Sequence, residues 1–68
     1  MVIVCTSTAV AGHVVLFLLE CSLFPRTHFR IDQTDRDGIT ITVMNTLSLA
    51  QDARIRAELA TTSGVAIQ

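Results

Sequence analysis

Four short segments of the chain have the hydrophobic pattern of β-strands. Apolar and polar residues alternate in THFRIDQ at 27–33 and in ITITV at 39–43. A period of two with one apolar face is typical of a half-buried strand. The apolar, β-branched run MVIVC at 1–5 predicts a buried strand, and VAIQ at 65–68 predicts a short closing strand.

Residues 9–23 form the first of two segments that are predicted to be helical. Ser7 or Thr8 can cap the N-terminus of this helix, because a hydroxyl oxygen accepts a hydrogen bond from the first turn. Pro25 ends it, since proline disfavours helical geometry in the residue before it.

A second helix is predicted to begin near Ser48. Ser48 and Gln51 have the spacing of a capping box. Asp52 places a negative charge in the first turn, where it suits the helix dipole, and it can pair with Arg56 one turn later. Gly64 is well placed to end this helix.

The two alternating segments are predicted to form a hairpin, closed by a three-residue loop of Arg36, Asp37 and Gly38. A turn of this length takes a left-handed residue, so we expect a positive φ at Gly38. The strand pairs predicted by this loop are Asp35 with Ile39, Gln33 with Ile41 and Ile31 with Val43.

The resulting order is β-α-β-β-α-β within 68 residues. This is the ferredoxin-like arrangement, an α+β fold in which both helices cover one face of a four-stranded antiparallel sheet. We expect a single domain of this kind over residues 1–68. A chain of this size buries only about 60% of its unfolded surface. Such domains often depend on a partner for stability.

The segment AVAGHVVLFLLECSLF at 9–24 is more apolar than one helix on one sheet requires. On a helical wheel, Leu16, Leu19 and Leu23 lie away from the face predicted to cover the sheet. That core face consists of Val10, Val14, Phe17, Leu18 and Cys21.

Three explanations account for the additional leucines. They can pack under the second helix, they can form a surface for a partner, or they can belong to a single membrane span over about residues 2–24. Polar residues interrupt that stretch, and the ferredoxin-like order gives every segment a place. We therefore interpret the segment as a core helix with an interface formed by Leu16, Leu19 and Leu23, and keep the span as the alternative.

Residues able to carry out chemistry are present without a recognisable motif. Cys5, His13, Cys21 and His28 lack the close pairwise spacing of a zinc site. The sequence has no nucleophile elbow and no glycine-rich phosphate loop, so we expect no catalytic residue, metal site or cofactor. The net charge of −1 argues against nucleic-acid binding. Two cysteines suit buried free thiols in a reducing, cytoplasmic compartment.

Three stretches, VIVC, RIDQTDRDGITITV and RIRAELATTSGVAIQ, resemble small regulatory domains of the ACT type. The closest similarity is to the ACT-like C-terminal domain of MgtC-type membrane proteins. The resemblance implies a non-catalytic regulatory module that acts as an oligomer and senses a ligand. It also implies a place in the cytoplasm, either as a separate protein or as the cytoplasmic domain of a membrane protein. Where ACT domains carry an Asp-x-x-Gly ligand turn, this chain has Thr6, Ser7 and Thr8.

The element order also resembles that of heavy-metal-associated domains. Those domains carry a Cys-x-x-Cys motif between the first strand and the first helix, and TSTAVAGHVV at 6–15 contains no cysteine. This second resemblance implies a degenerate domain without the metal function. The sequence therefore predicts a regulatory or interaction module whose partner is a further copy of the chain or another protein.

Overall fold

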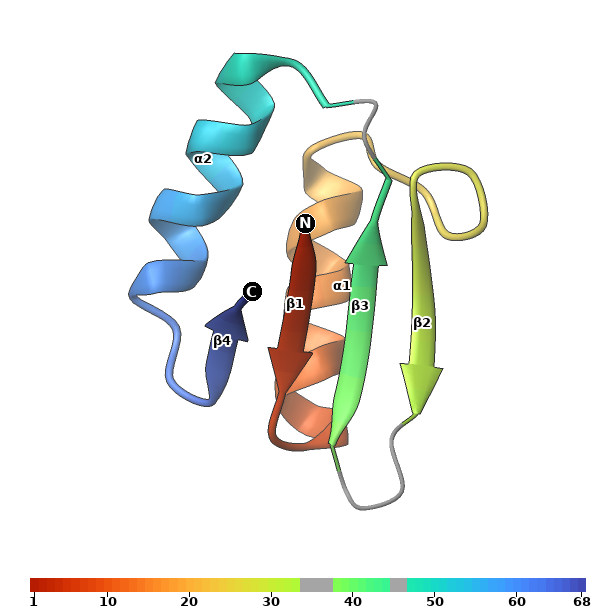
Figure 1. The fold of residues 1–68 in the computed structure, drawn as a ribbon, viewed down its shortest axis with the longest axis vertical. Helices are drawn as coiled ribbons and strands as arrows, with labels where there is room; N and C mark the ends of the chain where they lie inside the picture. Colours follow the sequence, from red (N-terminus) through yellow and green to blue (C-terminus); the bar gives the residue numbers. More distant parts are fainter. Residues whose placement is uncertain (34–37, 45–46) are drawn as a thin grey trace.

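The structure is a computed structural model that describes residues 1–33, 38–44 and 47–68. The described residues form strands and helices in the predicted β-α-β-β-α-β order (Figure 1). The elements are β1 (Val2–Cys5), α1 (Thr8–Glu20), β2 (Phe29–Gln33), β3 (Ile39–Val43), α2 (Leu49–Ala60) and β4 (Val65–Ile67).

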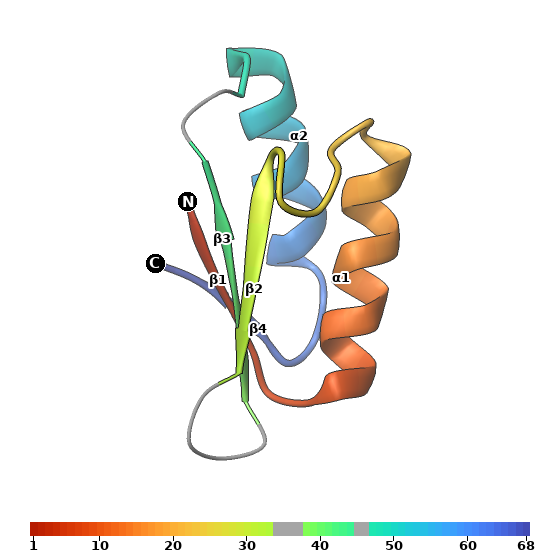
Figure 2. The ribbon, with the colours of Figure 1, turned by 90° about the vertical axis from the view of Figure 1, so that its right-hand side faces the viewer.

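The four strands form one antiparallel sheet in the order β2-β3-β1-β4. Both helices lie on the same face of this sheet (Figure 2). The predicted α+β class and ferredoxin-like arrangement are therefore confirmed. In this order β2 and β4 are the two edge strands, and α2 packs nearer to β4 (Figure 1).

The pairing of β2 with β3 differs from the prediction by two residues. Phe29 lies opposite Val43, Ile31 opposite Ile41 and Gln33 opposite Ile39. A shift of two residues keeps every side chain on its face, so the alternation of apolar residues could not reveal it. The observed register pairs the two buried side chains Phe29 and Val43.

Part of the predicted hairpin loop lies outside the described residues. Arg36 and Asp37 belong to the segment 34–37, which the structure does not describe. The φ angle predicted for Gly38 depends on the position of Asp37, so that prediction also falls outside the described part of the chain.

Both helices begin at a serine cap, as predicted. The Ser7 side chain accepts a hydrogen bond from the Val10 N–H at 3.2 Å. At the start of α2, the Gln51 N–H donates to Ser48 Oγ and the Ser48 N–H donates to Gln51 Oε1, each at 3.1 Å. The second pair is the predicted capping box.

The predicted ion pair between Asp52 and Arg56 is present on the exposed side of α2. The helix ends at Ala60, so Gly64 does not terminate it directly. Gly64 instead forms the turn into β4 with a φ of 82°. Its carbonyl accepts a hydrogen bond from the Thr6 N–H at 3.0 Å, which ties this turn to the end of β1.

The C-terminus of α1 lies at Glu20, three residues before the predicted end. Ser22 adopts a left-handed φ of 63°. The Ser22 N–H donates to the Leu19 carbonyl and the Leu23 N–H donates to the Leu18 carbonyl, both at 3.0 Å. These two hydrogen bonds make a Schellman motif, which reverses the chain at the helix end.

The expectation that Leu23 lies on an exposed helix flank is therefore wrong. Leu23 follows the Schellman turn and folds back into the core, where it is 2% exposed. Leu23 and Leu18 belong to the same buried cluster, and these are the two positions whose apolar side chains commonly accompany the motif. Leu23 thus contributes to the core and is not part of the proposed interface.

The hydrophobic core lies between the sheet and the two helices. On α1, Val14, Leu18 and Cys21 are buried and Val10 and Phe17 are partly buried against them, which agrees with the predicted core face. The buried residues of the core are Ile3, Cys5, Ala11, Val14, Leu18, Cys21, Leu23, Phe29, Ile41, Val43, Ile55 and Leu59.

Residues 2–24, the alternative membrane span, divide into β1, the 13-residue helix α1 and the turns beside them. Within the described ranges, neither helix combines the length and the apolar composition that crossing a bilayer requires.

Candidate interaction surface

Large apolar side chains are exposed on one side of α1. Leu16 is 63% exposed and Leu19 is 37% exposed. The other large apolar side chains that are exposed in the described parts of the chain are Phe24, Ile31, Met44 and Leu49. Leu16 and Leu19 lie three residues apart and are therefore neighbours on the helix surface.

The two leucines do not pack under α2, which was one of the three explanations for them. Phe17 takes that place, because the Arg54 guanidinium of α2 lies 5.9 Å from the centre of its ring. Leu19 follows Phe17 by two residues, or about 200° around the helix. It therefore lies on the opposite flank, on the side of β2.

Leu16 lies between these two flanks. It lines a shallow depression on the outer side of the helices together with His13, Phe17, Glu20 and Glu58. This depression combines one apolar side chain that faces solvent with two acidic groups. The predicted row of three leucines is thus reduced to Leu16 and Leu19.

Ile31 on β2 adds a third exposed apolar side chain to this side of the molecule. It shares the helix-facing side of the sheet with Phe29, yet it is 47% exposed while Phe29 is completely buried. β2 is an edge strand, so the helices leave Ile31 partly uncovered. We call Leu16, Leu19 and Ile31 together the α1–β2 surface.

An open pocket lies at the N-terminal part of β2, beside the loop that follows α1. It is lined by Pro25, Arg26, Phe29, Arg30 and Ile31, so an apolar floor is bordered by two guanidinium groups. The loop is held in place by the Arg26 N–H, which donates to the Phe29 carbonyl at 2.8 Å. This hydrogen bond occupies the outer edge of β2 at Phe29.

Beyond Phe29, the outer edge of β2 presents its backbone to solvent. The Met44 N–H donates to the His28 carbonyl at 2.9 Å, so residues 28 and 44 form a hydrogen-bonded pair. Hydrogen-bonded and non-hydrogen-bonded pairs alternate along antiparallel strands. The backbone groups of Arg30 and Asp32 therefore point toward β3, and those of Ile31 and Gln33 point toward the open edge.

The side chains of Arg30 and Asp32 lie on the face of the sheet opposite the helices. They form an ion pair with 2.9 Å between Nε and Oδ2, and both are largely exposed. An exposed pair of this kind contributes little to stability, so it can exchange partners readily.

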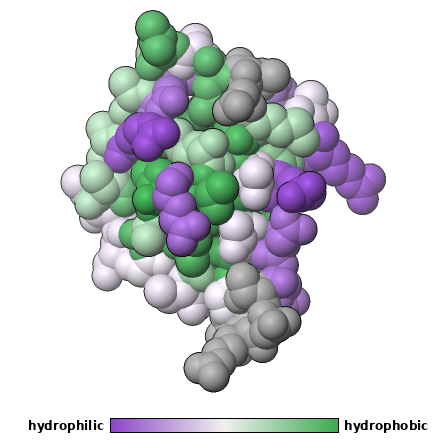
Figure 3. Space-filling model, viewed as in Figure 1, coloured by the Kyte–Doolittle hydropathy of each residue, from purple (hydrophilic) through white to green (hydrophobic). Residues whose placement is uncertain are grey.

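The rest of this sheet face carries short side chains. Val2 and Val4 of β1, Thr40 and Thr42 of β3 and Ala66 of β4 occupy it. Figure 3 shows an apolar patch at the centre of this face and hydrophilic residues on the side of β2. The outer faces of the described strands carry no aromatic side chain on which a nucleic-acid base could stack.

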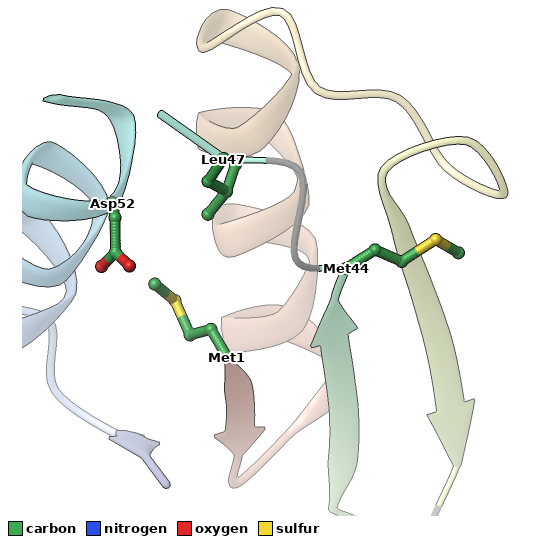
Figure 4. Close-up of a pocket in the computed structure, with 4 residues that line it drawn as sticks. All are labelled: Met1, Met44, Leu47 and Asp52. Atoms are coloured by element: carbon green, nitrogen blue, oxygen red, sulfur yellow. The ribbon is translucent and has the colours of Figure 1, made fainter. Parts of the chain in front are cut away.

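A second pocket lies at the N-terminus and is lined by Met1, Met44, Leu47 and Asp52 (Figure 4). The Met1 amino group donates to the Val43 carbonyl at 3.2 Å, which fixes the start of the chain. The Met1 side chain extends toward Asp52, whereas Met44 points away from both. The two thioethers therefore do not converge on a common point.

The predicted chemistry-bearing residues are dispersed. Cys5 and Cys21 are free thiols buried in the core, as predicted, and burial raises the pKa of the Cys5 thiol above its ordinary value. His28 Nδ1 accepts a hydrogen bond from the Phe24 N–H at 3.0 Å and so has a local structural role. Over the ranges that the structure describes, no three His, Cys, Asp or Glu side chains gather at a metal-binding distance.

Comparison with known proteins does not extend these observations. No family model, no curated protein and no solved structure matches the chain.

Proposed function

We propose that this chain is a non-catalytic interaction module of the regulatory kind, that it acts as an oligomer, and that it works in the cytoplasm. The observation that carries the proposal is the exposure of the neighbouring Leu16 and Leu19 on α1, together with that of Ile31 on an edge strand. Contiguous exposed apolar surface is typical of protein interfaces. The two free buried thiols are in keeping with a reducing compartment.

The small size of the hydrophobic core favours association of the chain with a partner. A chain of 68 residues gains little stability from its core alone. An interface adds stability by mass action, because a partner binds only the folded chain. Burying a leucine side chain contributes roughly 1.5–3 kcal/mol, so a few apolar residues suffice to make association favourable.

The test is the double substitution Leu16→Glu with Leu19→Glu. Since both side chains are exposed, we expect the variant to keep its helices and strands and to become monomeric. Light scattering at increasing protein concentration measures the mass, and circular dichroism measures the fold. The matched control is Leu49→Glu with Ala57→Glu, which adds the same charge at two exposed positions of α2 and should remain an oligomer.

Two results would overturn this proposal. One is a wild-type chain that stays monomeric at millimolar concentration. The other is a double variant that associates as strongly as the wild type. A variant that loses its circular-dichroism spectrum would instead place the two leucines in the core, contrary to their exposure in the structure.

A further inference from the structure

The loop between α1 and β2 is closed by a hydrogen bond that depends on the charge of one imidazole. We propose that His28 is a pH-sensitive switch, which holds residues 24–29 closed while its side chain is neutral and lets them open when it takes up a proton. The inference goes beyond the proposed function, because it concerns this loop and requires no partner. Figure 2 shows the loop between the end of α1 and the start of β2.

Two hydrogen bonds join the ends of the loop at Phe24 and His28. The His28 N–H donates to the Phe24 carbonyl at 2.9 Å, and the Phe24 N–H donates to His28 Nδ1 at 3.0 Å. The first bond connects two backbone groups and is independent of the side chain. The second needs a lone pair on Nδ1, which the imidazole has only when it is neutral and carries its proton on Nε2. The closed loop therefore selects one charge state and one tautomer of His28.

The backbone of the closed loop is in an unfavourable conformation at Arg26. Its φ is 70°, in the left-handed region that residues other than glycine seldom adopt. The Arg26 N–H donates to the Phe29 carbonyl at 2.8 Å, and Pro25 lies beside Phe29 as an isolated bridge. Such a conformation persists only while the surrounding contacts hold it, so the loss of one hydrogen bond favours opening of the loop.

Protonation of His28 removes the acceptor. Both ring nitrogens of the cation are donors, so Nδ1 then presents an N–H to the N–H of Phe24. Histidine undergoes this change between about pH 5 and pH 8. The bond therefore stabilises the closed loop at the upper end of this range and is lost as the pH falls.

The basic and uncharged groups around His28 do not offset this loss. Arg26 and Arg30, two residues before and after it, line the pocket at the start of β2 and stay positive over this range. On β3, the Met44 N–H donates to the His28 carbonyl, and this residue carries no charge. The Phe24 ring, whose centre is 6.0 Å from that of the imidazole, is also uncharged.

The nearby acidic side chains are directed to other places. Asp32 pairs with Arg30 at 2.9 Å. Glu20, at the C-terminus of α1, lines the depression on the outer side of the helices together with Glu58. Within the described ranges neither ion pair of the chain involves His28, so no carboxylate stabilises the cation in the closed loop.

Opening exposes a surface that the closed loop covers. The Phe29 carbonyl loses the Arg26 N–H, and Pro25 leaves the wall of the open pocket whose floor includes Phe29 and Ile31. The Phe29 side chain itself is completely buried and remains in the core. The pH therefore controls access to the start of β2 without unfolding the domain.

The test follows the Phe24 amide proton by NMR at pH 8 and at pH 5. The quantity measured is its protection factor, which is the ratio of the intrinsic exchange rate to the observed rate at the same pH. In the wild-type chain we expect this factor to fall roughly tenfold or more at pH 5. The amide of Leu18 in α1 should keep its protection and so report an intact core. His28→Ala, which has no acceptor, should give the low value for Phe24 at both pH values.

Two matched variants separate the switch from other effects of pH. His28→Asn places Oδ1, an acceptor that does not titrate, at the same distance along the side chain as Nδ1, so protection should stay high at pH 5. His13→Asn removes the exposed histidine of α1 and should behave as the wild type.

Three results would overturn the proposal. One is a wild-type protection factor at Phe24 that is the same at pH 8 and pH 5. Another is a His28→Asn variant that opens at pH 5 as the wild type does. The third is an equal loss of protection at Phe24 and Leu18, because acid would then unfold the domain as a whole.

Discussion

The two helices lie on the same face of the sheet, but their solvent-facing sides differ in polarity. α2 buries Ile55 and Leu59 and, beyond the exposed Leu49 at its first position, turns charged residues outward, among them the paired Asp52 and Arg56. α1 also buries one face, yet its outer side carries Leu16, and its first turn has no acidic residue. A helix whose only role is to cover a sheet has one apolar side and one charged side, as α2 does.

Under the proposed function, this difference separates the surface that folds the domain from the surface that associates. The polar exterior and the capping box stabilise α2 locally, so this helix does not depend on a further contact. The apolar exterior of α1 has no such function within one chain and becomes favourable only when another surface covers it. The comparison can be tested by substitutions whose effects differ between the two helices and between the two faces of α1.

The largest expected difference lies between the two faces of α1. Leu18 is completely buried, so Leu18→Ala should lower the free energy of unfolding by about 2–5 kcal/mol. Leu16→Ala should change it by less than about 0.5 kcal/mol, because this side chain is exposed in the single chain. Urea denaturation at a concentration low enough to keep the protein monomeric measures both values. Similar losses for the two variants would mean that Leu16 belongs to the core.

The next largest effect concerns the glycine after α2 and the glycine within α1. A Cβ atom at Gly64 would lie 2.7 Å from Thr6 Oγ1, and its φ is 82°. Gly64→Ala should therefore lower the free energy of unfolding by roughly 1–2 kcal/mol. At Gly12 a Cβ atom meets no atom within 4 Å, so Gly12→Ala should raise the free energy of unfolding by about 0.5–1 kcal/mol. Thermal unfolding that ranks the two variants in the reverse order would contradict this difference.

The smallest effect concerns charge in the first helical turn. Ala9→Glu gives α1 the N-terminal negative charge that it lacks, and we expect a gain of about 0.5 kcal/mol. Asp52→Ala removes that charge and the pair with Arg56 from α2, and we expect a loss of similar size. Both differences should shrink in 1 M salt, where exposed charges are screened. Equal effects at low and high salt would rule out an electrostatic origin.

The sequence was sufficient to predict the elements, their order and the caps of both helices. These features depend on local chemistry, such as the hydroxyl of Ser7 or the box formed by Ser48 and Gln51. The register of β2 against β3 could not be predicted from such local chemistry. Alternation distinguishes the two faces of a strand, and a shift of two residues leaves those faces unchanged.

The candidate surface was predicted in part. Leu16 and Leu19 were identified from the helical wheel, whereas Leu23 was misplaced because nothing in Cys-Ser-Leu indicates that Ser22 adopts a left-handed conformation. Ile31 was missed, because its alternation with Arg30 assigned it to the core face. The available signal was the ferredoxin-like order itself, which places this strand at the sheet edge.

The rate at which the two buried thiols react with a labelling reagent reports how often the core opens. Thiol reagents react with the thiolate, and Cys5 has neither exposed surface nor an ordinary pKa in the folded chain, since burial raises it. Cys5 on β1 and Cys21 after α1 belong to the same core. Their labelling therefore proceeds through transient opening, and comparing the two rates distinguishes fraying of α1 from unfolding of the whole domain.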